Sequence, residues 1–254
     1  DEFVNIHVGD RTVPALLSAL PQATAIPLTW RLFGNAGIRR YQDRPVAQQF
    51  TKAAPAIMGW PWRAAMFKTL FRNDGSYGKL GVHRPRQPDR TTTHRWFDGS
   101  GRELPPLYHH SRVFSPFGPD NYKLAQLNHY ALQSMESYVV KCDRGRANRD
   151  ASTFDMSYWV ERTCNSAEDT RILGLDAHSA PLRSDLPEDP GLGPLHHRAA
   201  AWRKAKFDEL MKQEPYRALM GRLMITPESV PLSRDSSNFI LDFARQSLVE
   251  ETKP

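Results

Sequence analysis

The sequence is poor in cysteine, with only Cys142 and Cys164 among 254 residues. Two cysteines cannot build the multi-disulfide framework of a small secreted domain or a four-cysteine zinc site. The sequence also lacks an apolar run approaching the roughly 20 residues of a membrane-spanning helix, and its first residues show no secretory signal pattern. The histidines lack the spacing of a zinc site. These absences favour a soluble protein of a reducing compartment.

Basic residues are in excess. Lys and Arg number 34 against 28 Asp and Glu, which gives a net charge of +6 and a pI near 9.4. Such an excess suits a phosphate-bearing partner, whether a nucleotide-sugar, a nucleic acid or an anionic lipid headgroup. Hydrophobic residues make up 40% of the chain, enough to bury a core in one large domain or two small ones.

The most informative stretch is residues 127–149. An alternating run from residue 122 predicts a strand that ends near Tyr130. Ser134 then reads as a helix N-cap, and Gly145 as the helix stop. Apolar residues at helical spacing predict the buried face of this helix: Met135, Tyr138, Val139 and Cys142. A histidine at a strand end, a capped helix and a basic tail together suit a metal ion or an anionic group.

The rest of the chain alternates between strand and helix patterns. We expect strands over residues 1–8, 25–33, 64–71 and 81–85, a hairpin turn at 98–101, and helices over 11–20, 154–161, 170–173, 197–211 and 216–224. Residues 177–194 are rich in Pro, Asp and Gly and read as a connector. This order predicts an α/β fold with a parallel or mixed sheet.

Four motifs carry a resemblance to a known family. They are Asn128-His129-Tyr130 with Ser134 and the Lys141-x-x-Arg144-Gly145-Arg146 end, Asp1-Glu2-Phe3, Trp30-Arg31-Leu32-Phe33-Gly34, and Phe67-Lys68-Thr69 with Gly81-Val82-His83-Arg84-Pro85. In order and spacing they resemble the bacterial family-2-like glycosyltransferases of the GT-A type, over roughly the first two-thirds of the chain.

The resemblance implies a GT-A-like mixed sheet flanked by helices. Residues 1–176 would form a partial catalytic domain, and residues 177–254 a connector with a helical C-terminal extension. Asp1 would be the second aspartate of the family's Asp-x-Asp-Glu-Phe segment, so the first strands of the domain would be missing. We expect a cytoplasmic protein, with peripheral contact at the inner membrane surface as a further expectation.

The resemblance also implies a metal-dependent transfer of sugar from a nucleotide-sugar donor to a saccharide or lipid-linked acceptor. Asp1 and His129 would hold Mn²⁺ or Mg²⁺, with His83 as the alternative histidine. Glu168 or Asp169 is proposed, by residue type only, as the base that accepts the acceptor proton. The substrate-binding candidates are Trp30, Phe33, Gly34, Lys68, Arg84, Tyr130, Ser134, Lys141, Arg144 and Arg146.

Several of these residues can instead have a purely structural role. His129 and Tyr130 can be a strand-end pair packed under a helix, Trp30 and Phe33 can be core aromatics, and Glu168 and Asp169 can be first-turn acids. Two other functions remain open. The chain can be a non-catalytic basic module that binds nucleic acid or anionic surfaces, although we expect no stable nucleic-acid complex, or it can hold half a transferase site that is inactive alone.

Overall fold

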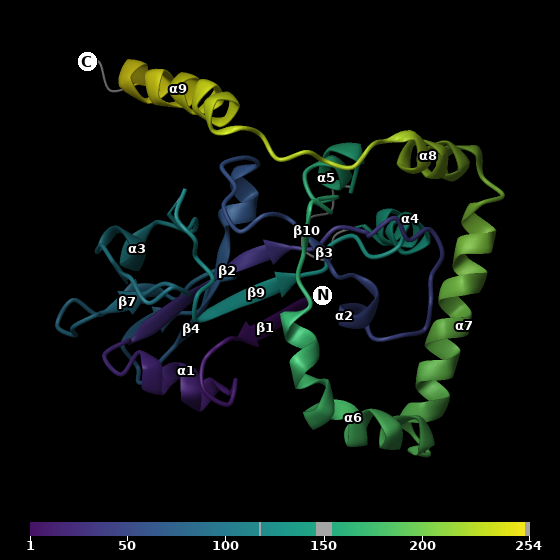
Figure 1. The fold of residues 1–254 in the computed structure, drawn as a ribbon, viewed down its shortest axis with the longest axis horizontal. Helices are drawn as coiled ribbons and strands as arrows, with labels where there is room; N and C mark the ends of the chain where they lie inside the picture. Colours follow the sequence, from purple (N-terminus) through teal and green to yellow (C-terminus); the bar gives the residue numbers. More distant parts are fainter. Residues whose placement is uncertain (117, 146–153, 252–254) are drawn as a thin grey trace. The chain divides into compact units, whose positions relative to one another are not determined.

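The fold was obtained as a computed structural model, which describes residues 1–116, 118–145 and 154–251. The chain divides into two compact units, each assembled from segments that are distant in the sequence. Figure 1 labels the helices and strands along the chain. Unit 1 comprises Asp1–Glu2, Leu32–Ala54 and Asn128–Ser229, and unit 2 comprises Phe3–Arg31, Pro55–Leu127 and Val230–Pro254. None of the described helices is long and apolar enough to cross a membrane.

A mixed sheet is the main element of unit 2. Its strand order is β1-β9-β2-β7-β8, with β4 also paired to β2. β2 and β7 are parallel, whereas β2 with β4 and β7 with β8 are antiparallel. The strands are β1 (Glu2–Ile6), β2 (Ala25–Leu32), β4 (Phe67–Phe71), β7 (Trp96–Phe97), β8 (Glu103–Leu104) and β9 (Ala125–His129), and α1 (Val13–Ala19) follows β1. The expected α/β class with a mixed sheet and flanking helices is confirmed.

Backbone hydrogen bonds show how β1 and β9 are placed. The N–H of His7 donates to the carbonyl of Leu124 at 2.8 Å, and the N–H of Tyr130 donates to the carbonyl of Asp1 at 2.8 Å. The residue number increases along β1 while that of its partner in β9 decreases, so the two strands run antiparallel. The start of β1 therefore lies beside the end of β9. The N–H of Phe33 donates to the carbonyl of His129 at 3.1 Å, so the end of β2 lies there too.

Helices dominate unit 1. The described ones are α2 (Val46–Gln49), α4 (Met135–Arg144), α5 (Met156–Val160), α6 (Asp176–Asp185), α7 (Leu192–Leu210) and α8 (Glu214–Ile225). Helices α4, α5, α7 and α8 share a core cluster that includes Tyr138, Val139, Trp159, Leu210 and Leu223, none of which is more than 1% exposed. This burial, rather than helix propensity, supplies most of the stability of short helices.

Helix α4 confirms the expectation for this segment. Ser134 accepts a hydrogen bond from the N–H of Ser137, and Gly145 ends the helix at a positive φ of 71°. Two further contacts fix α7 and α8 against α4: Lys206 Nζ lies 3.3 Å from Asp143 Oδ2, and the Tyr216 hydroxyl donates to Asp143 Oδ1 at 2.7 Å.

The remaining elements are short, apart from α9. They are β3 (Lys52–Ala53) paired with β10 (Ala167–Glu168), β5 (Tyr77–Lys79) paired with β6 (Arg86–Pro88), α3 (Leu107–His110), α9 (Arg234–Glu251), and the 3-10 turns η1 (Trp62–Ala65), η2 (Arg171–Leu175) and η3 (Leu186–Glu188). The hairpin turn expected at residues 98–101 is confirmed, since β7 and β8 flank it.

Two local expectations are wrong. Residues 81–85 form a bend instead of a strand, and a Cβ built on Gly81 would collide with the carbonyl of Arg84, which shows how tightly the backbone folds back. Residues 177–194 are mostly helical instead of a connector. Pro181 lies within α6 and does not end the helix, contrary to the expectation for a proline-rich segment. Residues from α4, which precedes residue 176, and from α7 and α8, which follow it, share one core.

Candidate metal centre and adjoining cavity

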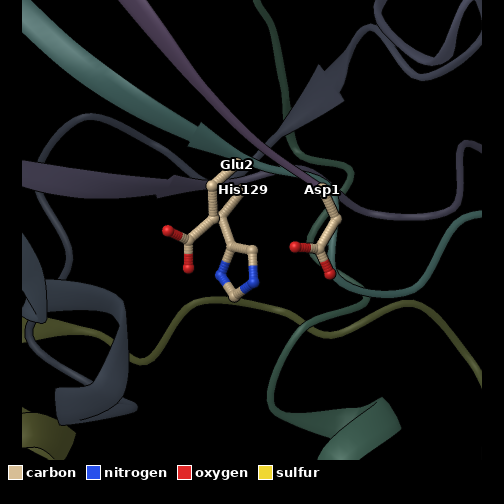
Figure 2. A group of neighbouring side chains, drawn as sticks. All are labelled: Asp1, Glu2 and His129. Carbon is tan, nitrogen blue, oxygen red and sulfur yellow. The ribbon is translucent and has the colours of Figure 1, made fainter. Parts of the chain in front are cut away.

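Three potential metal ligands meet where β1 begins and β9 ends. One carboxylate oxygen each from Asp1 and Glu2 and one ring nitrogen of His129 all lie within 4.8 Å of one another. Figure 2 shows the two carboxylates on either side of the imidazole. The antiparallel pairing of β1 with β9 explains this meeting of residues far apart in the chain, since strands of opposite direction bring a start beside an end.

Solvent exposure decreases from Asp1 through Glu2 to His129. Asp1 is exposed, Glu2 is half-buried and His129 is buried, with 5% of its surface accessible. A cation that arrives from solvent would thus meet the aspartate first. The imidazole lies behind it, where lower polarity strengthens electrostatic contacts.

Lys141 lies next to this group. Its ammonium donates to the carbonyl of Ala131 at 2.6 Å and lies 3.7 Å from Asp1 Oδ2. It also lies 4.8 Å from the ring centroid of Phe154 and 5.2 Å from that of Tyr158. A carbonyl and two aromatic rings therefore hold the ammonium beside the Asp1 carboxylate, since ring faces attract cations.

A cavity of about 530 Å³ opens beside Asp1 within unit 1. Its volume falls in the range of about 300–1,000 Å³ that is usual for small-molecule sites. The charged groups that line it are Asp1, Lys141, Arg144 and Arg203, together with the polar Gln133 and Ser137 and the aromatic Trp202. Because three cations and one carboxylate stand among the described lining residues, the cavity suits an anionic ligand.

A smaller cavity of about 230 Å³ adjoins the first, and Gln133, Ser137 and Arg203 line both. The smaller cavity also contacts Tyr41 and Ser134. Ser134 Oγ donates to Ser137 Oγ at 2.8 Å while accepting from the Ser137 N–H. The Ser134 side chain is thus committed to capping α4, on the wall of this cavity.

The other candidates of unit 1 lie in packed surroundings. Phe33 and Tyr130 are each 1% exposed, with ring centroids 4.5 Å apart. Asn128 donates to the Tyr130 hydroxyl at 3.0 Å, and burial raises the pKa of Tyr130 to about 12. A Cβ on Gly34 would collide with Asn165, so glycine is required there for close packing.

The two proposed base candidates are both ion-paired. Glu168 Oε2 lies 3.2 Å from Lys52 Nζ at the exposed surface. Asp169 is buried, and its Oδ2 lies 2.6 Å from Arg171 Nη2. Its Oδ1 accepts from the Arg171 N–H at 3.2 Å, at the start of η2. Arg146, a substrate-binding candidate, lies outside the described residues.

The remaining candidates belong to unit 2. His83 Nδ1 lies 3.0 Å from the carbonyl oxygen of Phe67, and burial lowers the pKa of His83. Its ring stands edge-on to buried Trp30 at 5.7 Å. Arg84 donates to the carbonyls of His109 and His110, which ties it to α3. Lys68 is half-buried on β4. The ligand group at Asp1 does not include His83.

Sequence reasoning missed three residues at this site. Glu2 was not assigned as a ligand, although it adjoins Asp1 and faces the same imidazole. Trp202 and Arg203 of α7 were not recognised as cavity residues. Their helix was expected only as a charged extension, and helical spacing carries no signal that distinguishes a cavity arginine from a solvated one.

No protein-family model, curated protein or solved structure matches this chain.

Proposed function

We propose that the chain is a metal-dependent glycosyltransferase that binds a nucleotide-sugar through a divalent cation and transfers the sugar to an acceptor hydroxyl. The observation that carries the proposal is the convergence of Asp1, Glu2 and His129 within 4.8 Å, next to a cavity lined mainly by cations. The ends of β9 and β2 at this site add support, because ligands of open α/β sheets bind outside the carboxyl ends of strands.

The three donors fit one cation. Metal–ligand bonds of about 2.0–2.6 Å keep the ligand atoms of one ion within about 5 Å of each other, and the observed 4.8 Å meets this limit. Carboxylates suit Mg²⁺ and Mn²⁺, whereas an imidazole is a poor ligand for Mg²⁺. The mixed oxygen and nitrogen set therefore favours Mn²⁺. When bound, such an ion neutralises the charge of a departing diphosphate.

Lys141 and Arg144 supply further positive charge to the cavity. Phosphate oxygens bind ammonium and guanidinium groups by charge-assisted hydrogen bonds, so both residues are placed to orient a diphosphate. Glu168 and Asp169 stay candidates, by residue type, for the base that accepts the proton of the acceptor hydroxyl, and each is ion-paired, with Lys52 and Arg171 respectively.

A basic module for nucleic acid has less support among the described residues. Many of their cations are matched by nearby acids, as in the pairs Arg95–Glu103, Arg102–Asp98 and Arg217–Glu214. Such matching weakens a phosphate-binding surface. Steeply salt-dependent retention on heparin, without metal-dependent nucleotide binding, would favour the module over the transferase.

Calorimetry with Mn²⁺, and with UDP in the presence and absence of Mn²⁺, tests the proposal. We expect one Mn²⁺ site, UDP binding that Mn²⁺ strengthens at least tenfold, and at least a tenfold loss of Mn²⁺ affinity in His129→Ala. His110→Ala is the matched control, because His110 is exposed on α3 and remote in sequence from the ligand group. Equal UDP affinity with and without Mn²⁺, or equal Mn²⁺ affinity in His129→Ala and the parent chain, would contradict the proposal.

A further inference from the structure

Arg203 is a half-buried cation whose protein partners are neutral. Its Nη2 donates to Gln133 Oε1 at 3.3 Å, and its guanidinium lies 4.8 Å from the ring centroid of Tyr41. Its Nε is buried and has no hydrogen-bond partner among the described residues. Burial lowers the pKa of Arg203, and the nearby charge of Arg144 adds to this shift.

This arrangement has a free-energy cost. A guanidinium stays ionised in proteins, and an ionised group removed from water is stabilised chiefly by an opposite charge. Gln133 and the Tyr41 ring offer only partial compensation. An anion would therefore bind more tightly beside Arg203 than beside a solvated arginine, because water competes less for the guanidinium.

The surroundings leave room for such an anion. Arg203 stands where the cavities of about 530 Å³ and 230 Å³ adjoin. Among the described residues that line the larger cavity, Asp1 supplies the only carboxylate. In the smaller cavity the carboxylate is that of Asp43, which already accepts from His196 Nε2 at 3.0 Å. Neither acid forms an ion pair with Arg203 in the described part of the chain.

The same cavity offers an apolar platform. Trp202 precedes Arg203 on α7, lines the larger cavity and is 59% exposed. A large exposed aromatic ring beside a charged pocket is typical of sites for ring-shaped ligands with both apolar and charged parts. Arg144 lines the same cavity and can share the negative charge.

We infer that Arg203, with Arg144 and Trp202, forms a metal-independent site for the carboxylate or phosphate group of an anionic saccharide. That this saccharide is the acceptor rests on the proposed function, whereas the anion site itself does not. The acceptor would enter past α7, and the donor would be held at the strand ends by Asp1, Glu2 and His129.

Binding of three sugar probes to the full chain tests this site. D-glucuronate and D-glucose 6-phosphate carry the two candidate anions, and D-glucose is the neutral match. We expect at least one anionic probe to bind without metal, at least tenfold more tightly than glucose. Tighter binding of glucuronate would identify a carboxylate as the preferred group, and tighter binding of glucose 6-phosphate a phosphate. Equal binding of all three probes, or none, would overturn the inference.

Variants then locate the site. Arg203→Met keeps an apolar stem and removes the charge, and we expect it to weaken the anionic probe at least tenfold. Arg203→Lys keeps the charge but loses the planar fork, so a smaller loss is expected. Lys204→Met is the matched control, because it removes one charge from the same helix outside both cavities. An equal loss in Lys204→Met would overturn the assignment.

These experiments remain informative if a variant is unstable or if the transferase proposal fails. Thermal melts followed by circular dichroism show whether Arg203→Met is folded, and the comparison of charged with neutral sugars in the parent chain needs no variant. Because the probes are titrated without metal, loss of Mn²⁺ binding and loss of anion binding are separate results.

Discussion

Lys141→Met is expected to tighten Mn²⁺ binding. The Lys141 ammonium lies 3.7 Å from Asp1 Oδ2, so it competes with a cation for that carboxylate. At about 4 Å, two unit charges interact by about 1 kcal/mol in water and about 4 kcal/mol at an effective dielectric constant near 20. The side chains are 15% and 42% exposed for Lys141 and Asp1, which favours the lower part of this range.

Without the ammonium, Mn²⁺ no longer competes for the Asp1 carboxylate against an interaction of about 1–2 kcal/mol. The Mn²⁺ affinity of Lys141→Met should therefore be about 5–30 times higher. Methionine retains an apolar stem near the rings of Phe154 and Tyr158, so the substitution conserves much of the packing. At saturating Mn²⁺ we expect the opposite effect on UDP, which should bind more weakly because one cation of the cavity is gone.

Titration calorimetry of Mn²⁺ and then UDP measures both effects. Lys52→Met is the matched control: Lys52 also pairs with an acid in unit 1, at 3.2 Å from Glu168, but it does not contact the ligand group. If Lys141→Met leaves Mn²⁺ affinity unchanged or lowers it, while Lys52→Met behaves like the parent, the electrostatic reasoning about the site is refuted.

Three further predictions concern stability. Ser134→Ala should lower the free energy of unfolding by about 1 kcal/mol, because α4 loses its capping oxygen; an unchanged urea midpoint would argue against the cap. Leu210→Ala should cost about 2–5 kcal/mol, since Leu210 is fully buried, whereas Leu195→Ala, at a site 53% exposed, should cost under about 0.5 kcal/mol; similar melting temperatures for the two would contradict this packing. Burial raises the pKa of both Cys142 and Cys164 from 9.0 to about 11, which disfavours the thiolate in the folded chain. The folded chain then holds protons that the unfolded chain releases, so this contribution to stability is complete below pH 9 and is lost as the pH rises toward 11. Urea titrations between pH 8 and 11 measure that loss, which should be smaller in a Cys142→Ala, Cys164→Ala double variant than in the parent chain.

Local signals predicted the local structure well. The cap at Ser134, the apolar stripe of α4 and the stop at Gly145 act within a few residues of one another, so the sequence pattern contains them fully. The bend at residues 81–85 was missed because its apolar and basic alternation looks like a strand end, whereas the backbone contact between Gly81 and Arg84 depends on tertiary placement.

The candidate site joins residues that are far apart in the sequence, so its prediction required knowledge of which strands and helices are neighbours. Asp1 and His129 were assigned by resemblance, and their meeting follows from the antiparallel pairing of β1 with β9. No sequence pattern within either strand specifies which strands are neighbours. The same limit applies to Arg203, whose partners Tyr41 and Gln133 come from distant parts of the chain.

The contact between Asp143 and Lys206, which anchors α7, affects which residues of the cavity lining can vary. Lys206 of α7 and Tyr216 of α8 both bind Asp143, so the helical wall is fastened at a point separate from the residues that face the cavity. Substitution of Trp202, whose side chain is 59% exposed, would therefore leave that anchor in place. If the proposed function holds, related chains that keep the Asp143 anchor but differ at position 202 would be expected to share a donor chemistry and to differ in the acceptors they take.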